Sequence, residues 1–219
     1  MFDLPKSTLF DRRIPKQKFY DNLSVTAELK KKFIDEITLI IWRNKISPAT
    51  VNISVGDSVT EIEVIEIHLN QAYVDLRVLQ LIDREIPYHI LFLLVFNDQV
   101  QAWICYKEQN QNNIATFKVD TYFHTEWQTI HELQLRLDGL TMDSVYENFI
   151  RQIAKTRLDS NKRYELKDAI ARVKQRLKLQ KAITALENRL YHERQFNIQI
   201  ALNEDLKRLR KELEEFDKS

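Results

Sequence analysis

The distribution of glycine and proline constrains this chain more than any other feature. Glycine occurs only at Gly56 and Gly139, and residues 161–216 contain neither glycine nor proline. Leucine, lysine, arginine, glutamate and glutamine dominate that stretch instead. Since glycine and proline are the residues that most often interrupt helices, this composition is typical of a long helix or a coiled coil. We therefore predict a globular domain over residues 1–157 and a helical tail over residues 158–219.

Apolar residues in the tail form three stripes that do not share one helix face. They are Leu166, Ile170, Val173 and Leu177; Leu179, Ile183, Leu186 and Leu190; and Leu202, Leu206, Leu209, Leu213 and Phe216. At about 100° per residue, the second stripe ends roughly 140° around the axis from the end of the first. A strict two-stranded coiled coil does not tolerate such a rotation. Either the helix contacts partners on different faces, or it breaks within residues 195–203, where Asn203 is able to cap a new helix.

We favour one continuous, coiled-coil-like helix over a hairpin and interpret the later stripes as an interface. Leucine and isoleucine at this spacing form an apolar surface that a second chain covers, either another copy of this protein or a different protein. The predicted contacts lie within residues 161–219. The residues assigned to the interface are Leu179, Ile183, Leu186, Leu190, Leu202, Leu206, Leu209 and Leu213.

The globular domain mixes helical and strand-like patterns. Apolar residues recur with a period near 3.6 in some segments and near two in others, and turn signals such as Gly56-Asp57 separate them. Because hairpins and helices alternate without regular βαβ repetition, we predict an α+β fold with a mixed or antiparallel sheet and flanking helices. The predicted helices cover residues 26–44, 73–86 and 142–157, and the predicted strands cover residues 51–55, 62–67, 89–96, 100–106, 114–119 and 130–137.

Residues that the chain lacks argue against several functional classes. Cys105 is the only cysteine, so an intrachain disulfide and a multi-cysteine zinc site are both impossible, which fits a cytoplasmic setting. Two isolated glycines cannot build a Walker A loop, a G-x-G-x-x-G turn or a nucleophile elbow. The N-terminus lacks the apolar core of a signal peptide, and the apolar run at residues 89–96 is too short to span a bilayer. We therefore predict no cofactor, no metal site and no membrane insertion.

The most suggestive chemistry lies in the stretch GDSVTEIEVIEIHLN, residues 56–70. Restriction-type nucleases place an aspartate near one strand and Glu-x-Lys on the next, where the carboxylates hold Mg²⁺. Asp57, Glu66 and His68 match this spacing loosely, and the predicted order of elements is compatible with such a fold. His68 departs from the pattern, because histidine suits softer metals and has a lower pKa than lysine.

The same stretch has a simpler interpretation, which we favour. Glu61 and Glu63 alternate with isoleucine and valine, as on a strand with one buried face. The apolar phase then flips at Ile65, and a bulge or a change of the covered face explains that flip. On this interpretation the acids are the solvated side of an ordinary sheet, and the domain is not an enzyme.

Charge is unevenly distributed, although the net charge is only +1. Residues 1–150 carry 15 Lys and Arg against 21 Asp and Glu, whereas residues 151–181 carry 11 against 3. A basic helix of this kind is able to contact phosphates, so nucleic acid is an alternative partner. A solvated helix face, or complementarity to the acidic domain, also explains the segment. The candidate nucleic-acid contacts are Arg172, Lys174, Arg176, Lys178 and Lys181.

Eight segments spread over nearly the whole chain carry a family resemblance. They are LPKST (4–8), RRIPK (12–16), KISPATVNI (45–53), LIDREIPYHILFLL (81–94), CYKE (105–108), YFHTEW (122–127), LDGLTMDSVYENFIRQI (137–153) and ERQFNIQIALNEDLKRL (193–209). Through them the chain resembles a bacterial family, domain of unknown function 4391. The resemblance brings no catalytic residues with it. Its members tend to be encoded beside helicases and DNA methyltransferases of restriction-like systems, which implies an accessory role in DNA processing or phage defence.

The leading hypothesis is therefore a non-catalytic, cytoplasmic accessory or assembly subunit that binds a protein partner, or itself, through its tail. The resemblance implies helicase or methyltransferase subunits as partners. The alternatives are a divergent metal-dependent nuclease-like domain that uses Asp57 and Glu66, and a DNA-binding adaptor that uses the basic residues 151–181.

Overall fold

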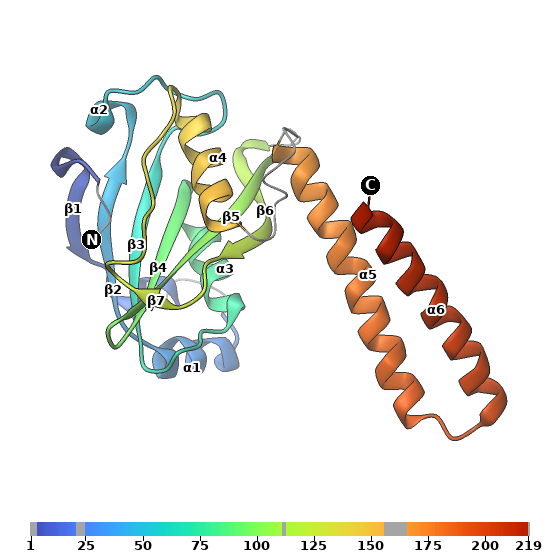
Figure 1. Cartoon of the computed structure of the whole chain (residues 1–219). Helices are drawn as coiled ribbons and strands as arrows, with labels where there is room; N and C mark the ends of the chain where they lie inside the picture. The colour runs from blue at the N-terminus through green and yellow to red at the C-terminus, as the bar shows by residue number, and fades with distance from the viewer. Residues whose placement is uncertain (1–3, 21–24, 111–112, 156–165, 219) are drawn as a thin grey trace. The chain divides into compact units, whose positions relative to one another are not determined.

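The computed structural model describes residues 4–20, 25–110, 113–155 and 166–218 of the chain (Figure 1). It divides into two compact units, Met1–Lys155 and Thr156–Ser219, which we call the sheet unit and the tail. The sequence places the division two residues later, after residue 157.

The sheet unit is built on one mixed sheet of seven strands. The strand order is β1-β2-β3-β4-β5-β6, and β7 pairs with β5 beside that path. Strands β3 and β4 are parallel, and the other neighbours are antiparallel. The strands are β1 (Leu9–Arg13), β2 (Ile37–Ile46), β3 (Ile62–Leu69), β4 (His89–Phe96), β5 (Gln99–Asn110), β6 (Asn113–His124) and β7 (Gln128–Thr129).

Helices connect and cover the strands of this sheet. Helix α3 makes the crossover that the parallel pair β3 and β4 requires. Three helices begin at side-chain caps: Thr26 accepts from the N–H of Leu29, Asp75 accepts from that of Arg77, and Thr141 forms a capping box. The helical elements are η1 (Lys6–Thr8), η2 (Lys16–Phe19), α1 (Ala27–Glu36), α2 (Pro48–Val51), α3 (Leu76–Glu85) and α4 (Met142–Ile153).

Both faces of the sheet are covered. One face packs against α1, α3 and η2, and its core includes Phe33 of α1, Leu79 of α3 and Phe92 of β4. Helix α4 lies over strands β5 and β6 on the other face (Figure 1), where Val145 and Phe149 are fully buried. A two-sided cover explains why β3 and β4 are buried along nearly their whole length.

The predicted α+β class, with its mixed sheet, flanking helices and long C-terminal helical region, is confirmed. The helix predicted over residues 26–44 is wrong in its second half, because α1 ends at Glu36 and β2 begins at Ile37. The apolar residues after Ile37 suit helical spacing, but pairing with β1 and β3 makes this segment a strand.

Two further strand predictions are wrong. Residues 51–55 do not pair with residues 62–67; the antiparallel partner of β3 is β2, and Ser54 makes only an isolated bridge to Thr141. Residues 130–137 contain no strand, although Leu133 and Leu135 are buried as their alternation suggests.

The tail consists of two helices, α5 (Leu166–His192) and α6 (Phe196–Lys218), which lie side by side and antiparallel (Figure 1). The preference for one continuous helix is therefore wrong. The chain turns at residues 193–195, where the Glu193 carboxylate accepts the backbone N–H groups of Arg194 and Gln195, each at 2.9 Å. Asn203 lies inside α6 and does not cap it, because its side chain donates to the carbonyl oxygen of Gln199.

Candidate functional site

Glu66 is held in a charged network rather than left open. Arg43 binds it with two hydrogen bonds, Nε to Oε2 at 2.6 Å and Nη2 to Oε1 at 2.9 Å. His68 Nε2 lies 2.6 Å from Oε1, and Asp11 Oδ1 lies 2.5 Å from Arg43 Nη1. Both carboxylate oxygens of Glu66 therefore already have cationic or hydrogen-bonding partners, and a metal ion would have to displace Arg43.

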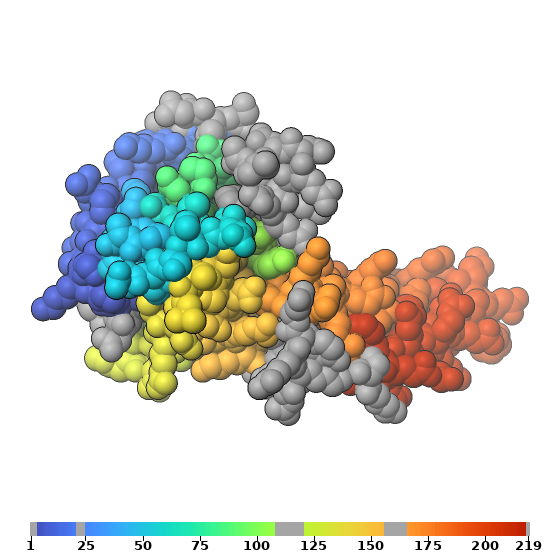
Figure 2. All heavy atoms as spheres, turned by 90° about the horizontal axis from the view of Figure 1, so that it is seen from above, coloured from blue at the N-terminus to red at the C-terminus, as the bar shows by residue number. Residues whose placement is uncertain are grey.

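The acidic turn at Asp57 packs against the start of α4. The Asp143 carboxylate, in the first turn of α4, accepts the backbone N–H groups of Asp57 at 2.5 Å and of Val59 at 2.8 Å. Ser58 adds its hydroxyl at 2.7 Å. Burial opposes ionisation of Asp143, but these hydrogen bonds keep its pKa below the usual range. Figure 2 shows the corresponding contact between the turn before β3 (cyan) and the start of α4 (yellow).

Gly56 is required by the same contact. A Cβ atom at this position would lie 2.5 Å from Asp143 Oδ2 and 2.8 Å from the Asp143 backbone nitrogen. A side chain there would push the turn off the carboxylate. The glycine at this turn is thus explained by packing against α4.

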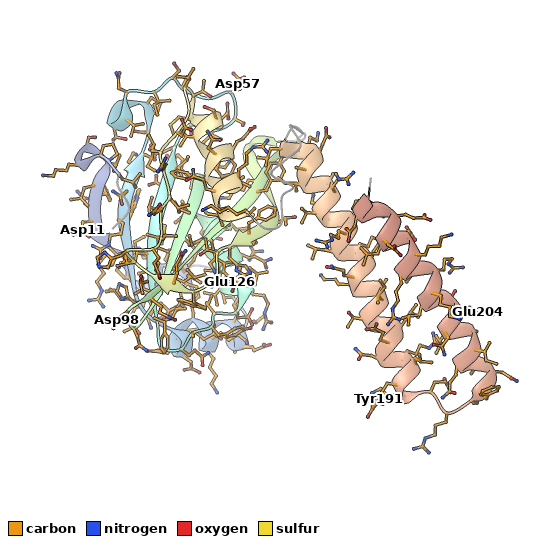
Figure 3. All side chains as sticks on the ribbon, viewed as in Figure 1. Asp11, Asp57, Asp98, Glu126, Tyr191 and Glu204 are labelled. Carbon is orange, nitrogen blue, oxygen red and sulfur yellow. The ribbon has the colours of Figure 1, made fainter. Side chains whose placement is uncertain are left out.

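The residues of the nuclease hypothesis do not converge. Asp57 lies in the turn near α4, whereas Glu66 lies in the middle of β3, opposite Ile41 of β2 and Leu93 of β4. Figure 3 labels Asp57 at one end of the sheet unit and Asp11, the partner of the Glu66 network, on the edge strand β1. Among the described residues, no group of three or more His, Cys, Asp or Glu side chains is arranged to hold a metal ion.

Glu61 and Glu63 form a carboxyl pair on the opposite side of β3 from Glu66. Glu63 is fully buried and accepts the indole N–H of Trp42 at 2.5 Å, while Lys45 Nζ lies 2.7 Å from Glu61 Oε2. Burial, together with a hydrogen bond to Glu61, raises the pKa of Glu63 to about 9. Within the described part of the chain, Oε1 of each glutamate is buried without a hydrogen-bond partner. Because its pKa is about 9, Glu63 is neutral at pH 7.

Sequence reasoning missed Glu63, because alternation placed it on a solvated face. Both faces of β3 are in fact covered, and the register shift lies in the neighbouring strand, between Trp42 and Asn44 of β2. The only signal in the sequence is that Ile65 and Ile67 follow Glu63 on the same side of the strand. Two apolar residues on the glutamate side indicate that this side is buried as well.

The basic segment of the tail is partly neutralised by the end of α6. Arg176 Nε lies 3.0 Å from Asp217 Oδ1, and Arg172 donates to the carbonyl oxygen of Phe216 at 3.3 Å while its guanidinium lies over that ring. Lys178 and Lys181 are exposed on α5. Residues 156–165, which contribute to the excess of positive charge, lie outside the described residues.

The apolar stripes assigned to a partner interface are covered within the hairpin. Leu179, Ile183, Leu202 and Leu206 are buried, and Leu186, Leu190, Leu209 and Leu213 are half-buried. The turn at residues 193–195 brings the second stripe, on α5, opposite the third stripe, on α6. Each stripe therefore covers the other, and these eight side chains do not form an open surface for a second chain.

Other apolar side chains of the tail are exposed where the two helices meet the turn. The exposed fraction is 85% for Tyr191, 72% for Phe196 and 45% for Ile200. Tyr191 lies at the end of α5 (Figure 3), and its ring packs edge-on against that of His192. We call residues 189–200 the hairpin tip.

The fold and these sites define an α+β protein that carries a helical hairpin and, in the described residues, no assembled metal centre. No described helix is long and apolar enough to cross a membrane. The chain belongs to the family described as Domain of unknown function (DUF4391), whose model matches residues 2–213 and confirms the resemblance noted in the sequence. No curated protein and no solved structure matches the chain.

Proposed function

We propose that this protein is a cytoplasmic accessory subunit that binds a protein partner through the hairpin tip. The observation that carries the proposal is the exposure of Tyr191 and Phe196, at 85% and 72%, on a described part of the chain that has a well-formed helix on either side. Large aromatic side chains are the residues that most often anchor protein interfaces.

The apolar residues of the tip are not part of the seam between the helices. Half-buried Ile198 and buried Leu202 belong to the same stripe of α6, whereas Phe196 and Ile200 each lie two residues before one of them. Two residues correspond to about 200° around a helix, so Phe196 and Ile200 face away from α5. They are four residues apart and form a short apolar ridge on the outer side of the hairpin.

The chemistry of the tip indicates the kind of surface that it fits. Tyr191, Phe196 and Ile200 present aromatic and aliphatic area, and the exposed cations Arg189 and Arg194 flank them. A complementary partner has an apolar groove with an acidic margin. The family resemblance implies that such a partner is a helicase or methyltransferase subunit of a DNA-processing or defence system.

The test is co-expression of the full chain with each product of the genes that flank its own gene. We expect a stable complex with one of them, and we expect Tyr191→Ser with Phe196→Ser to weaken that complex by about tenfold or more. The matched control is Glu204→Ser with Lys207→Ser, which removes two exposed side chains from α6, the helix that carries Phe196. Circular dichroism establishes that both variants keep their helices.

Two outcomes would contradict this proposal. A complex that survives the aromatic variant unchanged would place the partner on another surface. Light scattering that shows a dimer of the chain alone, dissociated by the same variant, would make the tip a self-association surface instead.

A further inference from the structure

A pocket of about 520 Å³ opens in the sheet unit between the N-terminal arm and the sheet. Trp42 of β2 and Glu63 of β3 lie on its sheet side. The arm contributes Phe10, Arg12, Arg13, Ile14, Pro15, Lys18 and Phe19. The loop at residues 85–88, between α3 and β4, forms the opposite wall. This volume lies within the range of small-molecule sites, which are mostly apolar clefts with a few convergent polar groups.

We propose that this pocket binds a small anion that carries a planar aromatic ring, such as a nucleoside monophosphate. The proposal concerns the sheet unit alone and does not depend on a protein partner at the hairpin tip.

The walls supply ring surface for stacking. The Phe10 and Trp42 rings lie 4.3 Å apart between centroids, and Tyr88 lines the other wall. The indole N–H of Trp42 is already bonded to Glu63, so Trp42 offers a ligand its ring rather than a donor. Aromatic side chains of this kind bind planar rings by stacking, largely independently of the ring's substituents.

The rim supplies positive charge. Arg12, Arg13 and Lys18 line the pocket, and all three are exposed. Among the residues that the structure describes, no carboxylate forms an ion pair with any of them; Arg12 instead lies 4.5 Å from the centroid of the Phe10 ring. Glu85 is the one exposed acid among the residues that line the pocket. The rim therefore favours an anion held beside the aromatic wall.

The buried side of the pocket adds no charge that would repel an anion. Burial and the hydrogen bond to Glu61 raise the pKa of Glu63 to about 9, so this side chain is a neutral carboxylic acid near pH 7. The other glutamate of the pair, Glu61, is matched by a cation, because Lys45 Nζ lies 2.7 Å from Glu61 Oε2. A pocket with three rim cations and a neutral buried acid is complementary to a monoanion or dianion.

The test is isothermal titration calorimetry of the full chain with adenosine 5′-monophosphate near pH 7. Adenosine provides the ring without the charge, and ribose 5-phosphate provides the charge without the ring. We expect the monophosphate to bind at least tenfold more tightly than either fragment, because only it uses both the wall and the rim. The proposal is overturned if no saturable binding occurs in the millimolar range, or if ribose 5-phosphate binds as tightly as the nucleotide.

Two variants locate the binding. Arg12→Gln and Arg13→Gln each remove one rim cation, and we expect each to weaken nucleotide binding by about fivefold. Lys31→Gln, which removes an exposed cation of α1 that does not line the pocket, is the matched control and leaves binding unchanged. Equal weakening by all three variants would mean unspecific charge attraction and would refute the site. Phe196→Ser, in the hairpin tip, distinguishes this proposal from the proposed function. We expect this variant to weaken binding of the protein partner and to leave nucleotide binding intact.

Discussion

The sheet unit and the tail differ in where they keep their charged groups. In the sheet unit, Asp83 of α3 and Lys107 of β5 form an ion pair at 2.8 Å whose side chains are 0% and 1% exposed. Tyr122 donates its hydroxyl to Asp83 Oδ2, and Lys107 Nζ donates to the carbonyl oxygen of Tyr88 at 2.6 Å. This network ties a helix to two strands inside the core.

In the tail, the described ion pairs between the helices lie at the surface. Arg176 pairs with Asp217 and Arg210 pairs with Glu187, and the four side chains are between 41% and 59% exposed. The seam between the helices is built from leucine and isoleucine instead. Exposed pairs of this kind contribute little to stability, so the seam holds the hairpin together.

The difference between the two units shows which side chains are needed for folding and which are not. A buried ion pair is no more stabilising than a well-packed apolar pair, but it is costly to break, because one charge is then left buried without its partner. The buried ion pair of the sheet unit therefore restricts how the side chains of its core can be arranged. The tail needs only its seam, and nothing in its folding requires aromatic side chains at the tip. That contrast supports a binding role for Tyr191 and Phe196.

The largest expected effect comes from breaking the buried pair. Lys107→Met leaves the Asp83 carboxylate buried without its cation, and we expect the free energy of unfolding of the sheet unit to fall by about 3–5 kcal/mol. Urea unfolding followed by tryptophan fluorescence measures this, since Trp42, Trp103 and Trp127 all lie in the sheet unit.

The double variant Lys107→Met with Asp83→Leu is the control for this experiment. It removes both charges, and we expect it to recover most of the lost stability, because an apolar pair of similar volume replaces the ion pair. If Lys107→Met unfolded at the same urea concentration as the wild type, the two units would not differ in the way described.

A smaller effect is expected from the seam of the tail. Leu206→Ala removes a 5% exposed side chain, and we expect a loss of about 2–3 kcal/mol from the hairpin. Because the tail is a separate compact unit, helix melting followed by circular dichroism moves to lower temperature while the tryptophan transition stays in place. Glu204→Ala, an exposed change on the same helix, is the control. A shared shift of both transitions would show that the two units unfold together.

The parts of the fold that the sequence predicts are those with a strong local pattern. The apolar run of β4 lies where the sequence predicts it, and helix α4 begins at Met142 as predicted but ends at Ile153. The helix predicted over residues 26–44 wrongly includes residues 37–44, because Ile37, Ile40 and Ile41 suit either period. Only the pairing of β2 with β3, which joins residues 16 to 32 positions apart in the sequence, decides in favour of a strand.

The candidate sites were also hard to predict, because they too depend on contacts between residues that lie far apart in the sequence. The pocket joins Phe10, Trp42, Glu63 and Tyr88, which come from four separate segments and meet only through strand pairing and the α3 crossover. The tail shows the opposite case. The sequence predicts that a second chain covers its later apolar stripes, whereas in the structure the stripes on α5 and α6 cover each other. Sequence spacing does not reveal whether the cover is another chain or the next helix.

The smallest effect is expected from Glu63→Gln. This substitution sharpens the comparison because it removes a buried ionisable group from the sheet unit without breaking that group's hydrogen bonds. Glu63→Gln keeps an oxygen that accepts from Trp42 and gains an amide that donates to Glu61. In the wild type, the pKa of Glu63 is raised from 4.5 to about 9 on folding. The stability contributed by this protonated group is complete below about pH 4.5 and is lost as the pH rises towards about 9.

We therefore expect Glu63→Gln to be about 1–3 kcal/mol more stable than the wild type near pH 7. At this pH the folded wild type keeps the Glu63 carboxyl protonated, whereas the same carboxyl ionises in the unfolded chain, and this difference favours unfolding. Urea unfolding at a series of pH values between 4 and 9 measures this. The free energy difference should grow with pH and vanish near the acidic end. Glu126→Gln, at an exposed position of the same unit (Figure 3), should leave the pH profile unchanged. A Glu63→Gln profile parallel to that of the wild type would mean that Glu63 is ionised in the folded protein, and the pocket would then hold a charge that repels anions.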